Sequence, residues 1–176
     1  MKVNYEDMRT SVFTFLCEIE TLVYTLEEIY ANSVLVDQLN NNAGAFFAQH
    51  QALLIDKIII EIAKLFDPDE DRQGNKNVSL RHLVRLAPES TENQEILNKQ
   101  WGKAKLLCKK TLIIRHKVLC HNDCSLLDKN IGVPLSVIKE TLVEVKLLFD
   151  MCCGSAHYRL KPNIYPARTL KNWVLG

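Results

Sequence analysis

Glycine and proline are scarce in this sequence, with 6 Gly and 5 Pro among 176 residues. Both residues mark turns, so their scarcity disfavours a turn-rich β architecture and favours long helices. No apolar run reaches the roughly 18 residues that a membrane span requires, and the N-terminus lacks the apolar segment of an export signal. We therefore expect a cytoplasmic protein with no membrane partner. Its six Cys should then be reduced thiols, because the cytosol does not sustain structural disulfides.

The composition is that of a packed globular protein. Hydrophobic residues make up 47% of the chain and charged residues 24%, which excludes a wholly disordered chain. A chain of this length is expected to hold one domain with a sizeable core. We expect residues 1–154 to form a helical bundle and residues 155–176 to form an irregular C-terminal extension with basic and aromatic side chains.

The charge is divided unevenly along the chain. Residues 1–75 contain 5 Lys and Arg against 13 Asp and Glu, whereas residues 76–176 contain 17 against 8. The basic excess is densest from Lys99 to Lys117, a stretch without one acidic residue. Such a block on a helix attracts polyanions. A solvated face that pairs with the acidic half of the chain accounts for the same charges, so both interpretations stay open at this point.

Apolar periodicity predicts two long helices in the first half of the chain. An amphipathic pattern covers residues 12–30. The pattern weakens in the Asn-rich stretch 40–44, and a second helix, apolar over most of its circumference, follows over residues 47–66. It should end there, because the residue before Pro68 disfavours the α region. The polar residues 67–77 are expected to form a surface loop.

The second half of the chain predicts a short helix and two more long ones. Ser79 can cap a short helix over residues 80–86. A third long helix should run from about residue 90 to His121. A fourth should cover about residues 134–153, with Gly154 as the residue that ends it. The expected fold class is all-α, a helical bundle of four main helices plus one short helix.

The third long helix carries a basic stripe. A projection at roughly 100° per residue brings five side chains within about 40° of one another, namely Lys99, Lys103, Lys110, Lys117 and His121. The same projection places Arg115 about 120° away, on an apolar face. We therefore expect Arg115 to be partly buried or at a subunit contact, with an anionic partner. A structural salt bridge to Glu18 or Glu20 of the first helix would meet that need without any catalytic role.

The end of this helix contains a recognisable string, Arg115-His116-Lys117-Val118-Leu119-Cys120-His121-Asn122-Asp123. It resembles the signature of the HEPN superfamily (higher eukaryotes and prokaryotes nucleotide-binding), in which Arg, followed by Asn, Asp or His, is closed by a later His. The string Ile62-Ala63-Lys64-Leu65-Phe66-Asp67-Pro68 and the later Ser79-Leu80 resemble the abortive-infection U-type branch of that superfamily. The resemblance covers roughly residues 43–153.

The resemblance implies a helical bundle that forms a homodimer, in which two facing motifs make one composite RNA-cutting site without metal or another cofactor. It implies an endoribonuclease of phage defence or of a toxin-like stress response. Carried over to this chain, Arg115 and His121 are the essential catalytic pair, and His116 occupies the polar position. RNA is the expected partner, with an antitoxin or other regulator as a further one. In toxins silenced by modification of a Tyr, that Tyr stands where this chain has Asp123, so this route of silencing is not expected here.

The chemistry of these residue types suits RNA cleavage through the 2′-hydroxyl. The reaction needs a group that exchanges protons near neutral pH and a fixed cation where charge gathers on the phosphorane. His121 and Arg115 can supply these, and Asp123 can orient the imidazole. The stripe lysines are candidates for RNA binding, with Lys117 closest to the motif.

Three other interpretations remain from the sequence. One is a HEPN module that binds RNA or nucleotides without cutting, and another is a helical interaction subunit in which the two charged halves serve assembly. The third interpretation is a zinc site, whose candidate ligands are His116, Cys120, Cys124, Cys152, Cys153 and His157. His121 also has a purely structural alternative, as a histidine at the C-terminus of a helix that is stabilised by the helix dipole.

Overall fold

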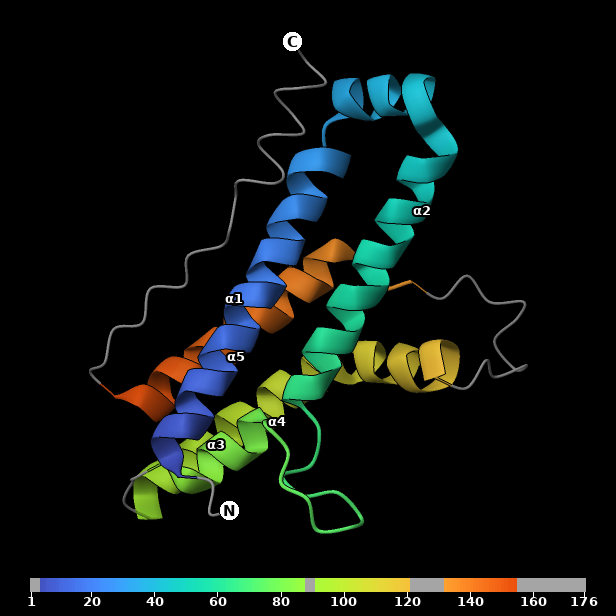
Figure 1. Ribbon diagram of the computed structural model, residues 1–176. Coiled ribbons are helices and arrows are strands. Elements are labelled where there is room, and N and C mark those ends of the chain that lie inside the picture. The colour runs from blue at the N-terminus through green and yellow to red at the C-terminus, as the bar shows by residue number, and fades with distance from the viewer. Residues whose placement is uncertain (1–3, 88–90, 121–131, 155–176) are drawn as a thin grey trace. The chain divides into compact units, whose positions relative to one another are not determined.

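A computed structural model describes residues 4–87, 91–120 and 132–154 (Figure 1). Its elements are, in chain order, α1 (Tyr5–Tyr30), α2 (Ser33–Leu65), α3 (Leu80–Leu86), α4 (Thr91–Ile114), the π-helix η1 (Arg115–Cys120) and α5 (Leu135–Cys153). Within these described ranges the only β pairing is an isolated bridge between Glu70 and Lys76. The predicted all-α fold, with four long helices and one short helix, is confirmed.

The described chain divides into two compact units. The motif unit comprises residues 4–15, 59–87, 91–120 and 132–154, and the hairpin unit comprises residues 16–58. Helices α1 and α2 each run from one unit into the other. The predicted C-terminal extension, residues 155–176, lies outside the described residues, so the division at residue 154 stays a prediction.

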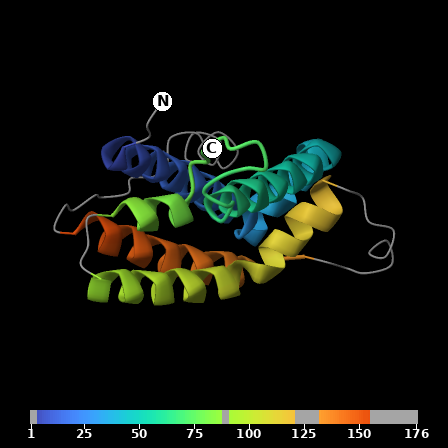
Figure 2. The same cartoon turned by 90° about the horizontal axis from the view of Figure 1, so that it is seen from below.

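In the motif unit, α4 packs against both α3 and α5. Figure 2 shows α4 (yellow-green) and α5 (orange) side by side and antiparallel, while the far end of α4 and η1 turn away from α5. The predicted apolar face of α5 is buried, with Ile138, Leu142 and Val145 all below 5% exposed. Phe149 is 1% exposed and stacks on Phe13 of α1 with ring centroids 6.1 Å apart. This core fixes α4 and thereby the segment that follows it.

Several helix ends lie where local sequence signals predict them. Helix α2 ends at Leu65, shortly before Pro68. The Ser79 side chain accepts a hydrogen bond from the His82 backbone N–H at 3.2 Å and caps α3. Gly154 ends α5 with a φ of 61°, a left-handed conformation that glycine adopts without steric cost.

The hairpin unit departs from the sequence expectation. Helix α2 begins at Ser33, ahead of the predicted start near residue 47, and its one non-helical residue is Ala43 (φ −158°, ψ 52°). The early turns form because Asn32 accepts a hydrogen bond from the Leu35 N–H at 3.1 Å, as an N-cap does. They are also held by packing, because Leu35 and Leu39 are buried against Ile29 of α1. The helical segment before residue 43 was not expected, whereas the break in the Asn-rich stretch was, because Ala43 separates the two helical segments of α2.

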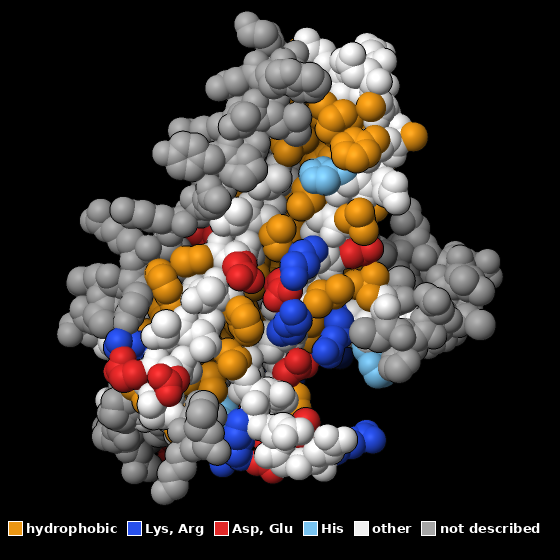
Figure 3. All heavy atoms as spheres, in the orientation of Figure 1, with side chains coloured by type: hydrophobic (Ala, Val, Ile, Leu, Met, Phe, Trp, Pro, Cys, Tyr) orange, Lys and Arg blue, Asp and Glu red, His pale blue; other side chains and the backbone are white. Residues whose placement is uncertain are grey.

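Large hydrophobic side chains remain at the surface of the hairpin unit. Phe46 is 63% exposed and Leu53 is 59% exposed. Figure 3 shows hydrophobic side chains gathered over the upper part of α2, with blue and red side chains further along the helix. No described helix combines the length and the apolar character that crossing a membrane requires.

Candidate functional site

The motif residues lie on a change of helix type. Helix α4 ends at Ile114, and residues Arg115–Cys120 form the π-helix η1. A π-helix pairs residues five apart, so it holds more residues per turn and rotates less per residue than an α-helix. The α-helical projection behind the basic stripe is therefore wrong beyond Ile114, including its placement of Lys117. Short π segments occur frequently at functional sites.

Arg115 is partly buried and has the anionic partner that was expected for it. Its guanidinium Nη1 lies 3.2 Å from Oδ1 of Asp67, and the two side chains are 33% and 27% exposed. Sequence reasoning pointed to Glu18 or Glu20, but the partner is Asp67, the second residue after α2. A guanidinium has five N–H donors, and one contact of this length uses a small part of that capacity. The remaining donors suit a phosphate, which arginine binds in the same planar geometry.

The loop after α2 places Asp67 through local backbone bonds. As the helix ends, the N–H of Phe66 bonds to the Ala63 carbonyl and the N–H of Asp67 bonds to the Lys64 carbonyl. The same loop reaches α3 through an ion pair between Asp69 and Arg85. The loop thus anchors to two arginines, only one of which belongs to the motif. Asp67 stands in the string on which the family resemblance rests, and that was the signal by which it could have been found.

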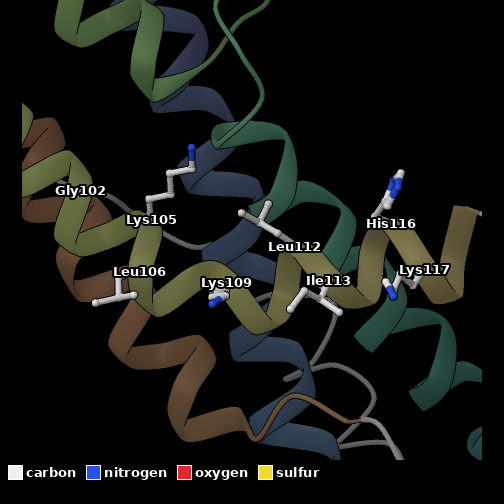
Figure 4. A pocket seen from close by; sticks show the side chains of 8 residues that line it. All are labelled: Gly102, Lys105, Leu106, Lys109, Leu112, Ile113, His116 and Lys117. Carbon is white, nitrogen blue, oxygen red and sulfur yellow. The ribbon is translucent and has the colours of Figure 1, made fainter. Parts of the chain in front are cut away.

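The two residues after Arg115 line a groove on the surface of the motif unit. His116 is exposed and Lys117 is partly buried. Together with one face of α4 they border a cavity of about 520 Å³, which we call the α4 groove (Figure 4). Its cationic residues are Lys105, Lys109 and Lys117, its hydrophobic residues are Leu106, Leu112 and Ile113, and Gly102 and His116 complete it.

Most of the lysines that line the groove differ from those that the sequence predicts to bind RNA. Lys99 and Lys110 are exposed but do not line it. The Lys103 ammonium lies 2.7 Å from Glu144 of α5. Hydrogen bonds from Lys103 and Gln100 lower the pKa of the Glu144 carboxyl. Of the four predicted RNA-binding lysines, only Lys117 borders the groove.

Lys105 and Lys109 are the functional candidates that sequence reasoning missed. They lie one helical turn apart on the face that leads to η1. The Lys105 ammonium also lies 4.6 Å from the centre of the Trp101 ring, and the Arg81 guanidinium lies 4.9 Å from the same ring. Such cation–π contacts hold flexible side chains in place. The sequence feature that could have indicated these two lysines is their alternation with Leu106 and Ile113 at helical spacing.

His121 and Asp123 lie outside the described residues, so their predicted roles in proton transfer and in orienting the imidazole stay predictions. Two of the zinc candidates, Cys124 and His157, lie outside them as well. Burial raises the pKa of the Cys153 thiol to about 11 and that of the buried Cys108 thiol to about 12. Among the residues that the structure describes, no group of three or more His, Cys, Asp or Glu side chains is placed to hold a metal ion.

Comparison with known protein families gives a match over most of the chain. The sequence pattern of the HEPN family AbiU2 matches residues 5–145. The match begins in α1, well before residue 43 where the resemblance in the sequence became apparent. It includes Asp67 and the whole motif from Arg115 to Asp123. Neither a curated protein nor a solved structure matches the chain.

Proposed function

The chain belongs to the AbiU2 family of HEPN domains, and from this premise we propose that it is a metal-independent endoribonuclease. The observation that carries the proposal is the Arg115–Asp67 ion pair at the start of a π-helical segment that borders the lysine-lined α4 groove. It combines an oriented guanidinium with a surface that attracts phosphates. The biological setting we propose is phage defence by abortive infection or a related stress response.

The proposed reaction is an internal transesterification. The RNA 2′-oxygen attacks the neighbouring phosphorus, a new O2′–P bond forms, and the bond from phosphorus to the 5′-oxygen breaks. One proton leaves the 2′-hydroxyl and one reaches the departing 5′-oxygen, and His121 carries out the proton transfer. The products are a 2′,3′-cyclic phosphate and a 5′-hydroxyl. The nucleophile is already next to its phosphorus, so the protein has to move a proton and neutralise charge.

Each motif residue has a distinct part in this scheme. Arg115 stabilises the charge that gathers on the equatorial phosphorane oxygens, and Asp67 holds its guanidinium in position. His116, beside it on η1, contacts the scissile region from the groove side. Asp123 orients His121. Lys117 holds a neighbouring phosphate, with Lys99, Lys103 and Lys110 binding the strand further away.

We propose further that the active form is a homodimer with one composite site. Each protomer contains a single Arg115 and a single His121, so two facing motifs would supply two cations and two proton-transfer groups to one phosphodiester. Light scattering at micromolar concentration measures this directly. A protein that cuts RNA as a strict monomer contradicts the composite site.

Incubation with RNA in the presence of a chelator tests the reaction. Wild-type protein should cut RNA in EDTA and leave 2′,3′-cyclic phosphate ends, and a substrate with one 2′-deoxy sugar at the cut should be resistant there. His121→Ala should be inactive while binding RNA with nearly wild-type affinity. Cleavage of DNA at a similar rate, or full activity in His121→Ala, would refute the mechanism and favour a HEPN module that only binds RNA.

A further inference from the structure

The α4 groove leaves large hydrophobic side chains accessible where an ordinary surface helix would be polar. Leu106 is 70% exposed and Ile113 is 42% exposed, and Leu112 lies between them in sequence. The cavity of about 520 Å³ falls within the size range of small-molecule and nucleotide sites. Exposed apolar side chains that form a contiguous patch on a soluble protein often mark a binding site.

The charges around the groove are all of one sign. Lys105, Lys109 and Lys117 border it, and no acidic residue is among the residues that line it. The sequence from Ile96 to Asn122 contains no Asp or Glu at all. The matching ligand is thus anionic on its outside and apolar on the faces that enter the groove. A single-stranded nucleic acid has this character, because its phosphates are charged and its bases present flat faces that can pack on apolar side chains.

The position of the groove relative to the motif favours RNA over an acidic peptide. His116 and Lys117 border the groove and directly follow Arg115, so the groove leads to the motif along one helix face (Figure 4). Lys105 and Lys109 are separated by about 6 Å along the helix axis, which is comparable with the distance between consecutive phosphates of an extended strand. A strand whose phosphodiester meets Arg115 would continue along these lysines.

We propose that the α4 groove is a nucleobase subsite, in which an unpaired base next to the scissile phosphodiester packs on Leu106, Leu112 and Ile113 while Lys105 and Lys109 bind the flanking phosphates. This inference rests on the proposed function and adds a substrate requirement to it. A base inside a duplex is stacked between its neighbours and cannot enter the groove. The substrate class is therefore RNA that is single-stranded beside the cut.

Binding to an RNA that cannot be cut tests the subsite separately from catalysis. The probe is a short single strand with a 2′-deoxy sugar at the cut, compared with an oligomer of the same length and charge whose flanking positions are abasic. Full-length wild-type protein should bind the base-containing strand about tenfold more tightly, since an abasic sugar leaves the apolar surface uncovered. Leu106→Ala and Ile113→Ala should lose most of that preference and bind the abasic strand as wild type does.

Leu147→Ala is the matched control, because Leu147 is 46% exposed on α5 and does not line the groove. It should keep the tenfold preference. Equal affinity of wild type for both strands overturns the subsite. So does a result in which Leu106→Ala and Ile113→Ala change the oligomeric state while the base preference stays, since the groove is then a protein contact. Base preference without any cleavage refutes the proposed function alone, and cleavage without base preference refutes the subsite alone.

Discussion

Two long helices of this protein are interrupted, and the interruptions differ in cause and in content. Helix α2 kinks at Ala43, within a stretch from Gln38 to Ile55 that carries no Lys, Arg, Asp or Glu. Helix α4 passes into the π-helix η1 at Arg115, at the end of the most basic stretch of the chain. Contacts between α1 and α2 within the hairpin unit hold the kink, whereas the first residue of the π segment pairs with a loop residue 48 positions away in the chain.

The kink at Ala43 is held by groups from its own unit. The Tyr30 hydroxyl bonds to the Phe47 carbonyl at 3.0 Å and to Nδ1 of His50 at 2.6 Å. Burial raises the pKa of the Tyr30 hydroxyl to about 12, so it remains a neutral hydrogen-bonding group throughout the physiological range. The Asn42 side chain donates to the Gln38 carbonyl at 2.8 Å, as asparagine does where helices bend. These hydrogen bonds stabilise the bent conformation of α2.

The π segment differs from the kink in how it is held. Its first residue, Arg115, pairs with a carboxylate that is itself partly exposed, so solvent and ligands can reach both groups. For an ion pair that is partly exposed to solvent, screening keeps the contribution to stability at roughly 1 kcal/mol. The two interruptions therefore differ in one respect that bears on a site: the π segment begins with a partly accessible charge that is held by a residue far away in the chain.

The largest effect should follow from removing the motif cation. If Arg115 stabilises the phosphorane as proposed, Arg115→Ala should lower the rate of RNA cleavage about 1,000-fold. Its unfolding free energy should change by less than about 1 kcal/mol. Arg85→Ala is the matched control, since Arg85 pairs with Asp69 of the same loop but stands outside the motif. For both variants, the cleavage rate is measured with RNA and the unfolding free energy by urea denaturation. An equal loss of cleavage in Arg115→Ala and Arg85→Ala would contradict the role proposed for Arg115.

A smaller loss should follow from Asp67→Asn, which keeps the shape of the side chain but removes its charge. We expect kcat to fall about tenfold without a rise in KM, because an unanchored guanidinium still attracts phosphate but is less well oriented. Asp67→Glu should recover part of the activity. Asp69→Asn serves as the control. An unchanged kcat in Asp67→Asn would leave the ion pair as a purely structural contact.

The kink should respond in stability and not in activity. Tyr30→Phe removes the hydroxyl that bonds Phe47 and His50, and we expect the unfolding free energy to fall by about 1 to 2 kcal/mol. The cleavage rate per folded molecule should stay at the wild-type value. Chemical denaturation followed by circular dichroism gives the first quantity. A cleavage defect in folded Tyr30→Phe would show that the two interruptions are coupled.

The smallest effect concerns single lysines of the basic helix. Lys110→Ala should reduce the slope of log affinity against log salt by about 0.7, the value for one phosphate contact on single-stranded RNA. Lys103→Ala should reduce it less, because Glu144 already neutralises part of that charge. Gln49→Ala, in the uncharged stretch around the kink, should leave the slope unchanged. Titrations at several salt concentrations measure all three, and equal slopes throughout would show that the basic helix does not contact phosphates.

Local signals in the chain are enough to predict most of the helices and several of their ends. Helical periodicity fixes which faces of α1 and α5 are buried, and local backbone chemistry fixes ends at Pro68, Ser79 and Gly154. These signals act over a few residues, so they can be read without a fold. The same holds for the motif string and the family that it indicates. Local reading failed at residues 33–42, where burial of Leu35 and Leu39 against Ile29 outweighs the low helix propensity of asparagine.

Only the tertiary structure decided how the candidate site is assembled. The partner of Arg115 comes from the loop after α2, and no periodicity in α4 could indicate Asp67. The change from α to π geometry alters the rotation per residue, so a projection made at one fixed angle misplaced Lys117. The α4 groove gathers Lys105 and Lys109 because packing against α5 turns the opposite face of α4 inward. Ion pairs and grooves depend on distances between segments that are remote in the chain, and a linear sequence does not contain those distances.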